Sequence, residues 1–169
     1  AGPARMARSL NSMLMGFSRV ETFVTAFIAK IDLKAGRATY CSAGHPPTMV
    51  IRPSSTPLGG GEARGGEVEL LGCQSGVIGA FESMVYETGV FTFAPGDMLF
   101  MYTDGTIEAR DRSGAVFGEQ RLRDLLLSVS GEGISGICGK VLGELDRFTE
   151  SALDDDIALV SLEFLRGRS

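Results

Sequence analysis

The spacing of apolar residues predicts helices at the beginning of the chain and in its second half. Apolar side chains recur every three or four positions over residues 4–15, as on one face of an amphipathic helix that ends near Gly16. Residues 119–129 and 137–148 show the same period, and the glycine-rich segment 131–136 separates them. We therefore expect three helices, two of them consecutive along the chain.

Most of the remaining chain has the composition and alternation of β-strands. The predicted strands are residues 22–33, 38–44, 48–52, 67–71, 84–93, 98–103 and 157–165. The first two are joined by the turn 34–37, which predicts a hairpin. Residues 98–103 are almost continuously apolar, as in a strand that is buried on both faces. The order helix, strands, two helices and strand predicts an α+β fold with a mainly antiparallel sheet.

The length and composition fit one globular domain. The 169 residues are 44% hydrophobic and 22% charged, so a single domain over residues 1–169 is expected. Within it, residues 53–66 are rich in Pro, Gly and Ser, and they predict an exposed loop because strand patterns resume on both sides. The net charge of −5 argues against nucleic acid as a partner. No apolar run approaches the roughly 18–20 residues that a membrane span requires.

The cysteines and the histidine limit the metal chemistry. Cys41, Cys73 and Cys138 are widely spaced and odd in number, which predicts no disulfide framework and a reducing, cytoplasmic location. With His45 as the single histidine and no paired cysteines, a zinc site is not expected. Any metal would be bound by oxygen ligands, which favours Mg²⁺ or Mn²⁺.

Three common catalytic motifs are absent from the sequence. No cysteine is followed by Arg six residues later, as the phosphate-binding loop of a cysteine phosphatase requires. The Gly-x-Ser-x-Gly motif of serine hydrolases and the Walker phosphate-binding motif are also absent. His45 could act as a general base, but its place beside two prolines at a strand end favours a structural or orienting role.

Two aspartates at strand ends form the candidate site. Asp104 directly follows the apolar strand 98–103, and Asp155 precedes the strand 157–165. If these strands are antiparallel neighbours, both carboxylates meet at one edge of the sheet and repel each other unless a cation lies between them. The alternative is structural, because Asp-Gly turns and Asp-rich strand junctions are common. Spacing alone leaves both interpretations open.

Longer segments resemble the PP2C-type phosphatases of the bacterial sporulation stage II E and stress-response regulator class. In chain order they are FVTAF (23–27), AGHPP (43–47), APGDMLFMYTDGTIEAR (94–110), FGEQRL (117–122) and DDIALV (155–160). The resemblance spans almost the whole chain. It implies an antiparallel β-sandwich flanked by helices in αββα layers, with a metal centre between the sheets.

The resemblance also implies an activity and the roles of several residues. Such enzymes hydrolyse phosphoserine or phosphothreonine in a protein, with two divalent cations, Mn²⁺ or Mg²⁺, that activate water without a covalent enzyme intermediate. By motif position, Asp104 and Asp155 would be metal ligands, Asp156 would occupy the following non-ligand place, and His45 would not be a ligand. Gly105 would allow the tight turn that exposes Asp104. The expected partner is a phosphorylated regulatory protein, such as an anti-sigma-factor antagonist.

The sequence departs from this family at its N-terminal side. It lacks the Gly-Asp-(Phe/Tyr)-Tyr-Asp and Asp-Val-x-Gly-His-Gly elements, which carry the acid that bridges both metals in the family. We expect this chain to be a fragment of a longer protein, that is, the C-terminal portion of the phosphatase domain. The alternatives are a sequence record from which residues are absent and a naturally truncated relative of the family. The sheet edges left without partners predict self-association. The alternative function is an inactive, phosphatase-like domain that binds a regulatory partner.

Overall fold

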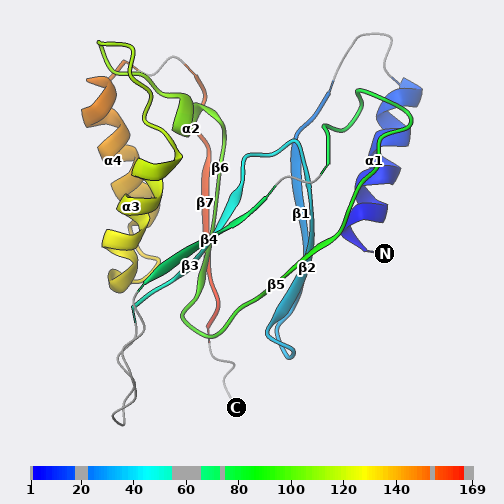
Figure 1. Ribbon diagram of the computed structural model, residues 1–169, viewed down its shortest axis with the longest axis horizontal. Helices are drawn as coiled ribbons and strands as arrows, with labels where there is room; N and C mark the ends of the chain where they lie inside the picture. Colours follow the sequence, from blue (N-terminus) through cyan, green and yellow to red (C-terminus); the bar gives the residue numbers. More distant parts are fainter. Residues whose placement is uncertain (1, 18–22, 55–65, 73–74, 153–154, 166–169) are drawn as a thin grey trace. The chain divides into compact units, whose positions relative to one another are not determined.

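The chain folds into two compact units in the computed structural model, which describes residues 2–17, 23–54, 66–72, 75–152 and 155–165. The first unit comprises residues 1–48 and 71–94, and the second comprises residues 49–70 and 95–169. All sheet pairings between named strands are antiparallel where their register is defined. The helices and antiparallel sheets confirm the α+β fold class (Figure 1).

The first unit is a three-stranded sheet with one helix. The strand order is β1 (Ala26–Asp32), β2 (Arg37–Ala43) and β5 (Gly89–Thr92). The predicted hairpin is confirmed, because β1 and β2 pair from Ala26↔Ala43 to Asp32↔Arg37. One carboxylate oxygen of Asp32 accepts the N–H groups of Lys34 and Ala35, which fixes the turn.

Helix α1 (Pro3–Phe17) confirms the predicted N-terminal helix, but it buries a different face. Ala7 is fully buried against Cys41 and Ala43 of β2, because its small side chain allows the helix to lie close to the sheet. The larger apolar residues that suggested the helix, among them Met6 and Met13, are about half exposed.

The second unit is a four-stranded sheet with helices. The strand order is β4 (Glu67–Leu71), β3 (Thr48–Arg52), β6 (Met98–Tyr102) and β7 (Leu159–Glu163). Its helices are α2 (Gly105–Glu108), α3 (Glu119–Val129) and α4 (Ile137–Thr149), with a short 3₁₀ turn, η1 (Ser130–Glu132), after α3. One hydrophobic core joins helices and sheet; its fully buried members include Met49, Ile51, Phe100, Leu122, Leu126, Val141 and Leu145.

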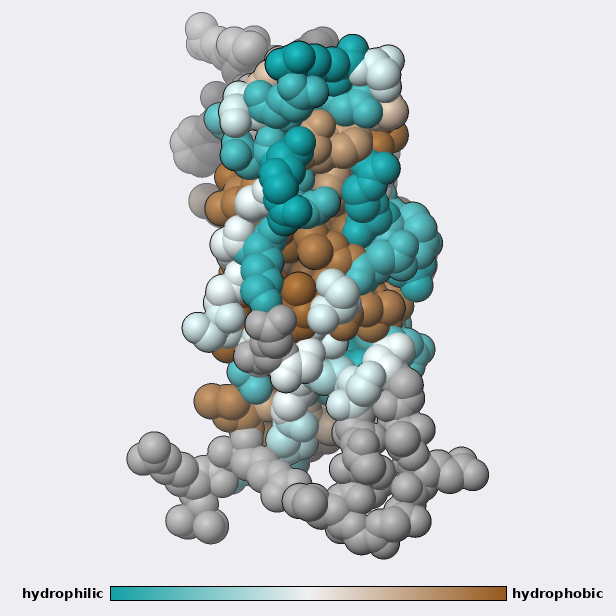
Figure 2. All heavy atoms as spheres, turned by 90° about the vertical axis from the view of Figure 1, so that its left-hand side faces the viewer, coloured by the Kyte–Doolittle hydropathy of each residue, from teal (hydrophilic) through white to brown (hydrophobic). Residues whose placement is uncertain are grey.

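The two long helices pack side by side on this sheet. Arg121 of α3 lies over the rings of Phe117 and Phe148, at 5.5 and 4.4 Å from their centroids, and so links α3 to α4. Figure 2, which faces the outer side of these helices, shows hydrophilic side chains over most of the face and apolar ones along its middle. The buried residues of α3 and α4 are all apolar apart from Thr149, so the apolar stripe predicted for each helix faces the core.

One predicted strand is wrong over most of its length. Residues 84–93 were expected to be extended, but only Gly89–Thr92 pair as β5. The reason is local hydrogen bonding: the Tyr86 hydroxyl donates to the Val77 carbonyl, and the Glu87 N–H donates to the Ser75 hydroxyl. These contacts satisfy polar groups of this segment outside any sheet.

Other sequence expectations fall partly outside the described residues. Most of the loop expected at 53–66 lies there, as does Cys73, so the loop stays a prediction, as does the single domain. Cys41 and Cys138 are free thiols. Among the described helices, none is long and apolar enough to cross a membrane.

Replacing Tyr102 by Phe is expected to stabilise the fold. The Tyr102 side chain is buried, and its hydroxyl has no hydrogen-bond partner among the described residues, an arrangement that costs free energy. Burial, with a smaller contribution from Glu119, raises the pKa of Tyr102 to about 12. Since the unfolded chain loses this proton first, near pH 10, stability falls as pH rises from about 10 to about 12. In urea unfolding at pH 8, the free energy of unfolding of the variant should be about 1 kcal/mol higher than that of the unmodified protein. Between pH 8 and pH 11, the variant should also lose less of its stability.

Tyr86→Phe is the matched control for this prediction. Tyr86 is equally buried, but its hydroxyl donates to the Val77 carbonyl at 3.1 Å, so the same change removes a hydrogen bond. This variant is expected to lose about 1 kcal/mol at pH 8. Equal effects of the two substitutions would show that the Tyr102 hydroxyl is not a destabilising group.

Candidate metal centre

Strands β6 and β7 bring the two candidate acids to the same edge of their sheet. The strands are antiparallel neighbours, with a register from Met98↔Glu163 to Tyr102↔Leu159. Asp104 follows the C-terminal end of β6, and Asp155 precedes the N-terminal end of β7. The pairing on which the sequence-based hypothesis depended is therefore present, and α2 begins at this edge (Figure 1).

The two acidic segments lie in direct contact at Gly105. A β-carbon placed on Gly105 would be 2.9 Å from the backbone oxygen of Asp156 and 3.3 Å from the β-carbon of Asp155. The carboxyl carbon of Asp155 would lie only 3.5 Å from the same point. Because Gly105 is the residue after Asp104, segments 51 positions apart converge on one place.

The motif predicts that Gly105 allows the tight turn that exposes Asp104, and the structure gives a further reason for glycine at this position. Gly105 is not among the described glycines with positive φ. It is instead the buried first residue of α2. Glycine is required because a side chain would collide with the backbone of Asp156.

Backbone amides orient both carboxylates. Asp104 caps α2, and its Oδ1 accepts the N–H of Gly105 at 3.1 Å. Asp155 makes the equivalent contact, because its Oδ1 accepts the N–H of Asp156 at 2.8 Å. Both aspartates are exposed, and neither is paired with a basic side chain within the described ranges. Two neighbouring carboxylates without a basic partner favour a bound cation.

The donor set fits a hard divalent cation but supplies only part of its ligands. Carboxylate oxygens are suitable ligands for Mg²⁺ and Mn²⁺, which prefer about six oxygens. Within the described ranges, no group of three or more His, Cys, Asp or Glu residues is arranged to bind a metal. Asp104 and Asp155 could therefore hold such an ion only together with water or further ligands. Asp156 is exposed beside them.

His45 lies in the first unit and is held by local contacts. Its Nδ1 is 2.8 Å from the carbonyl oxygen of Pro46, which fits a donated hydrogen bond. Its ring packs near that of Phe27, with centroids 6.3 Å apart. The Ser42 hydroxyl donates to the His45 carbonyl at 3.3 Å. These contacts orient the ring, and its role stays a prediction.

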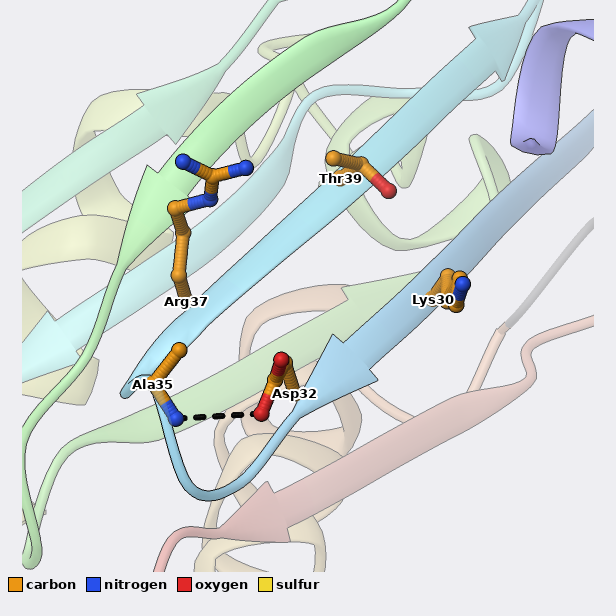
Figure 3. A pocket seen from close by; sticks show the side chains of 5 residues that line it. All are labelled: Lys30, Asp32, Ala35, Arg37 and Thr39. Atoms are coloured by element: carbon orange, nitrogen blue, oxygen red, sulfur yellow. Dashed lines mark hydrogen bonds between the residues drawn. The ribbon is translucent and has the colours of Figure 1, made fainter.

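A surface pocket in the first unit has different chemistry. This cavity of about 460 Å³ lies on the β1–β2 hairpin and is lined by Lys30, Asp32, Ala35, Arg37 and Thr39 (Figure 3). Asp32 points back to the turn, where it accepts the N–H of Ala35. The pocket thus offers two basic groups and one carboxylate engaged by the backbone, and not the paired acids that a Mg²⁺ or Mn²⁺ site requires.

The sequence is similar to a known protein family and to curated proteins. The sequence matches the family described as Stage II sporulation protein E (SpoIIE) over residues 1–165. It is 27% identical over 143 residues to Protein IcfG of Synechocystis sp.; this alignment covers 83% of the present chain and 20% of IcfG. It is 23% identical over 163 residues to the phosphoserine phosphatase RsbU of Bacillus subtilis; this alignment covers 95% of the present chain and 44% of RsbU. The chain thus spans less than half the length of either relative.

Solved structures establish the fold class. The SiaA-PP2C domain of Pseudomonas aeruginosa has a TM-score of 0.78 at 18% identity, covering 96% of this chain and 61% of that domain. The SpoIIE phosphatase domain of Bacillus subtilis, presoaked with Mn, has a TM-score of 0.61 at 18% identity, covering 96% of this chain and 67% of that one. RsbX in complex with magnesium has a TM-score of 0.56 at 21% identity, covering 94% of this chain and 60% of RsbX. The fold is that of a PP2C domain.

Within that class, the match over residues 1–165 defines the family. The chain belongs to the SpoIIE family, as its sequence motifs predicted.

Proposed function

We propose that the full-length protein is a metal-dependent phosphatase that removes phosphate from phosphoserine or phosphothreonine in a regulatory protein. The observation that carries this proposal is the contact at Gly105, which places Asp155 against the residue that follows Asp104. Membership of the SpoIIE family and the similarity to a phosphoserine phosphatase support it. An anti-sigma-factor antagonist is the proposed substrate class, on the resemblance to stress-response regulators.

In this proposal Asp104 and Asp155 are ligands of a divalent cation, Mn²⁺ or Mg²⁺. Such a cation supplies Lewis-acid chemistry, which activates water and neutralises phosphoryl oxygens. The chain's own contribution is to present two carboxylates in a fixed orientation, since the amides of Gly105 and Asp156 each bind one carboxylate oxygen. Hydrolysis consumes one water and yields inorganic phosphate and the free hydroxyl of serine or threonine.

Phosphate release from a phosphoserine protein tests the proposal. The full-length protein is incubated with a phosphorylated antagonist encoded in the same genome, with Mn²⁺, with Mg²⁺ or with a chelator. Release is expected with a divalent cation, to disappear with the chelator and to return when metal is added in excess. The alternative, a phosphatase-like domain that binds its partner without catalysis, predicts binding but no metal-dependent release.

A further inference from the structure

We infer that Thr103 is a positioning residue of the proposed metal centre. Its hydroxyl connects the segment that carries Asp155 to the segment that carries Asp104. This inference rests on the proposed function, because Thr103 is given a role only in relation to a metal bound by these aspartates. Sequence reasoning did not single out Thr103, since it follows an apolar run as an ordinary polar residue.

The Thr103 hydroxyl makes two hydrogen bonds to the backbone before β7. It donates to the carbonyl oxygen of Asp156 at 3.0 Å and accepts the N–H of Ala158 at 2.9 Å. The backbone N–H of Thr103 also donates to the Ala158 carbonyl at 3.1 Å. A hydroxyl has one hydrogen to donate and lone pairs to accept, so this side chain uses both capacities.

These contacts extend the pairing of β6 and β7 toward the acids. The regular register ends at Tyr102↔Leu159, and the Thr103 backbone contact to Ala158 continues it. The hydroxyl then reaches Asp156, where backbone pairing has ended. Asp155 directly precedes Asp156, so the side chain of Thr103 fixes the chain next to the proposed ligand.

The Asp156 carbonyl lies between Thr103 and Gly105. Thr103 binds it by a hydrogen bond, and a β-carbon on Gly105 would be 2.9 Å from the same oxygen. The hydrogen bond from Thr103 therefore holds the carbonyl against the Asp104 segment, at a point that the absence of a side chain on Gly105 leaves open. Groups that orient metal ligands from outside the first coordination shell affect metal affinity strongly.

The test compares Thr103→Val with Thr103→Ser by calorimetric titration of the full-length protein with Mn²⁺ alone. Valine keeps the shape but removes both hydroxyl contacts, and serine restores them. Thr103→Val is expected to weaken Mn²⁺ binding about 10-fold, as for other residues that orient ligands, while Thr103→Ser binds like the unmodified protein. Rescue by serine distinguishes a hydroxyl contact from a general packing effect.

Two further variants separate positioning from stability. Ser130→Ala removes another buried hydroxyl of the same unit, which donates to the Leu127 carbonyl, and should lower stability without changing Mn²⁺ affinity. If Thr103→Val does not fold, Thr103→Cys replaces it, since a thiol is a weak donor. Hydrogen exchange of the Ala158 amide should be faster in Thr103→Val or Thr103→Cys than in Thr103→Ser.

The possible outcomes are distinct. Unchanged Mn²⁺ affinity in Thr103→Val, with binding lost in Asp104→Asn, would overturn the inference and leave the proposed function standing. The same loss of affinity in the Ser and Val variants would also overturn it. No Mn²⁺ binding by the unmodified protein would remove the metal centre from the proposed function, and the role of Thr103 with it.

Discussion

Replacing Asp104 by Asn in the full-length protein is expected to abolish metal-dependent phosphatase activity. The change removes the negative charge of one of two proposed ligands while keeping the shape of the side chain. We expect kcat/KM to fall more than about 100-fold. Even mutation of a residue that only orients a metal ligand typically lowers metal affinity or activity by about 10- to 100-fold. Phosphate release from the phosphorylated antagonist, measured over a range of Mn²⁺ concentrations, gives the result. Asp155→Asn should behave in the same way.

The fold is expected to survive both substitutions. Asn caps helices about as well as Asp, so the contact between residue 104 and the Gly105 amide is retained. The amide oxygen of Asn at position 155 can likewise accept the N–H of Asp156. Without metal, loss of one charge also relieves repulsion between the acids. The thermal unfolding midpoints of both variants, measured with a chelator present, should therefore be close to that of the unmodified protein. Such a result would exclude unfolding as the cause of inactivity.

Asp124→Asn is the control for a general charge effect. Asp124 is exposed on α3 in the same unit and accepts a hydrogen bond from Gln120. Its replacement changes the net charge equally but leaves the candidate centre intact, so full activity is expected. Wild-type activity in Asp104→Asn or Asp155→Asn would contradict the assignment of these residues as ligands.

The sequence was sufficient to predict most of the helices and strands of the unit that contains the candidate site. The helices at 119–129 and 137–148 and the strands at 48–52 and 67–71 lie where their apolar periods placed them, within one residue. Long amphipathic helices and buried strands have many apolar positions in one period, so their signal is strong. The apolar pattern did not determine which strands are neighbours; the antiparallel pairing of β6 and β7, the condition for the two acids to meet, is present in the structure.

The details that connect the two acids could not be predicted in this way. Helix α2 has four residues, barely more than one turn, and so has no period to detect. The bridge made by Thr103 joins residues 53 and 55 positions apart, and the contact at Gly105 depends equally on the folded backbone. Side-chain contacts of this kind carry no local pattern. The exposed apolar face of α1 was missed for a related reason, because Ala7, and not a larger residue, packs on the sheet.

Replacing Gly105 by Ala is expected to damage both stability and metal binding. The added methyl group would lie 2.9 Å from the Asp156 oxygen and 3.3 Å from the Asp155 β-carbon, so the backbone before β7 must move. Forcing a methyl group into a closely packed site costs about 1–3 kcal/mol. Urea unfolding should show this loss. Because the displaced residues include a proposed ligand, the Mn²⁺ affinity measured by calorimetry should fall as well.

Gly139→Ala is the matched control for the added methyl group. Gly139 is an exposed residue of α4, and a β-carbon there would meet nothing within 4 Å. In a helix, alanine is favoured over glycine by up to about 1 kcal/mol, and Gly139 lies in the first turn of α4, so this variant should be somewhat more stable than the unmodified protein. Its Mn²⁺ affinity should not change, since Gly139 has no contact with either acid. Opposite signs of the two stability changes would show that the close approach at residue 105, and not glycine content, sets the geometry of the candidate centre. An unaltered Mn²⁺ affinity in Gly105→Ala would contradict the dependence of metal binding on this contact.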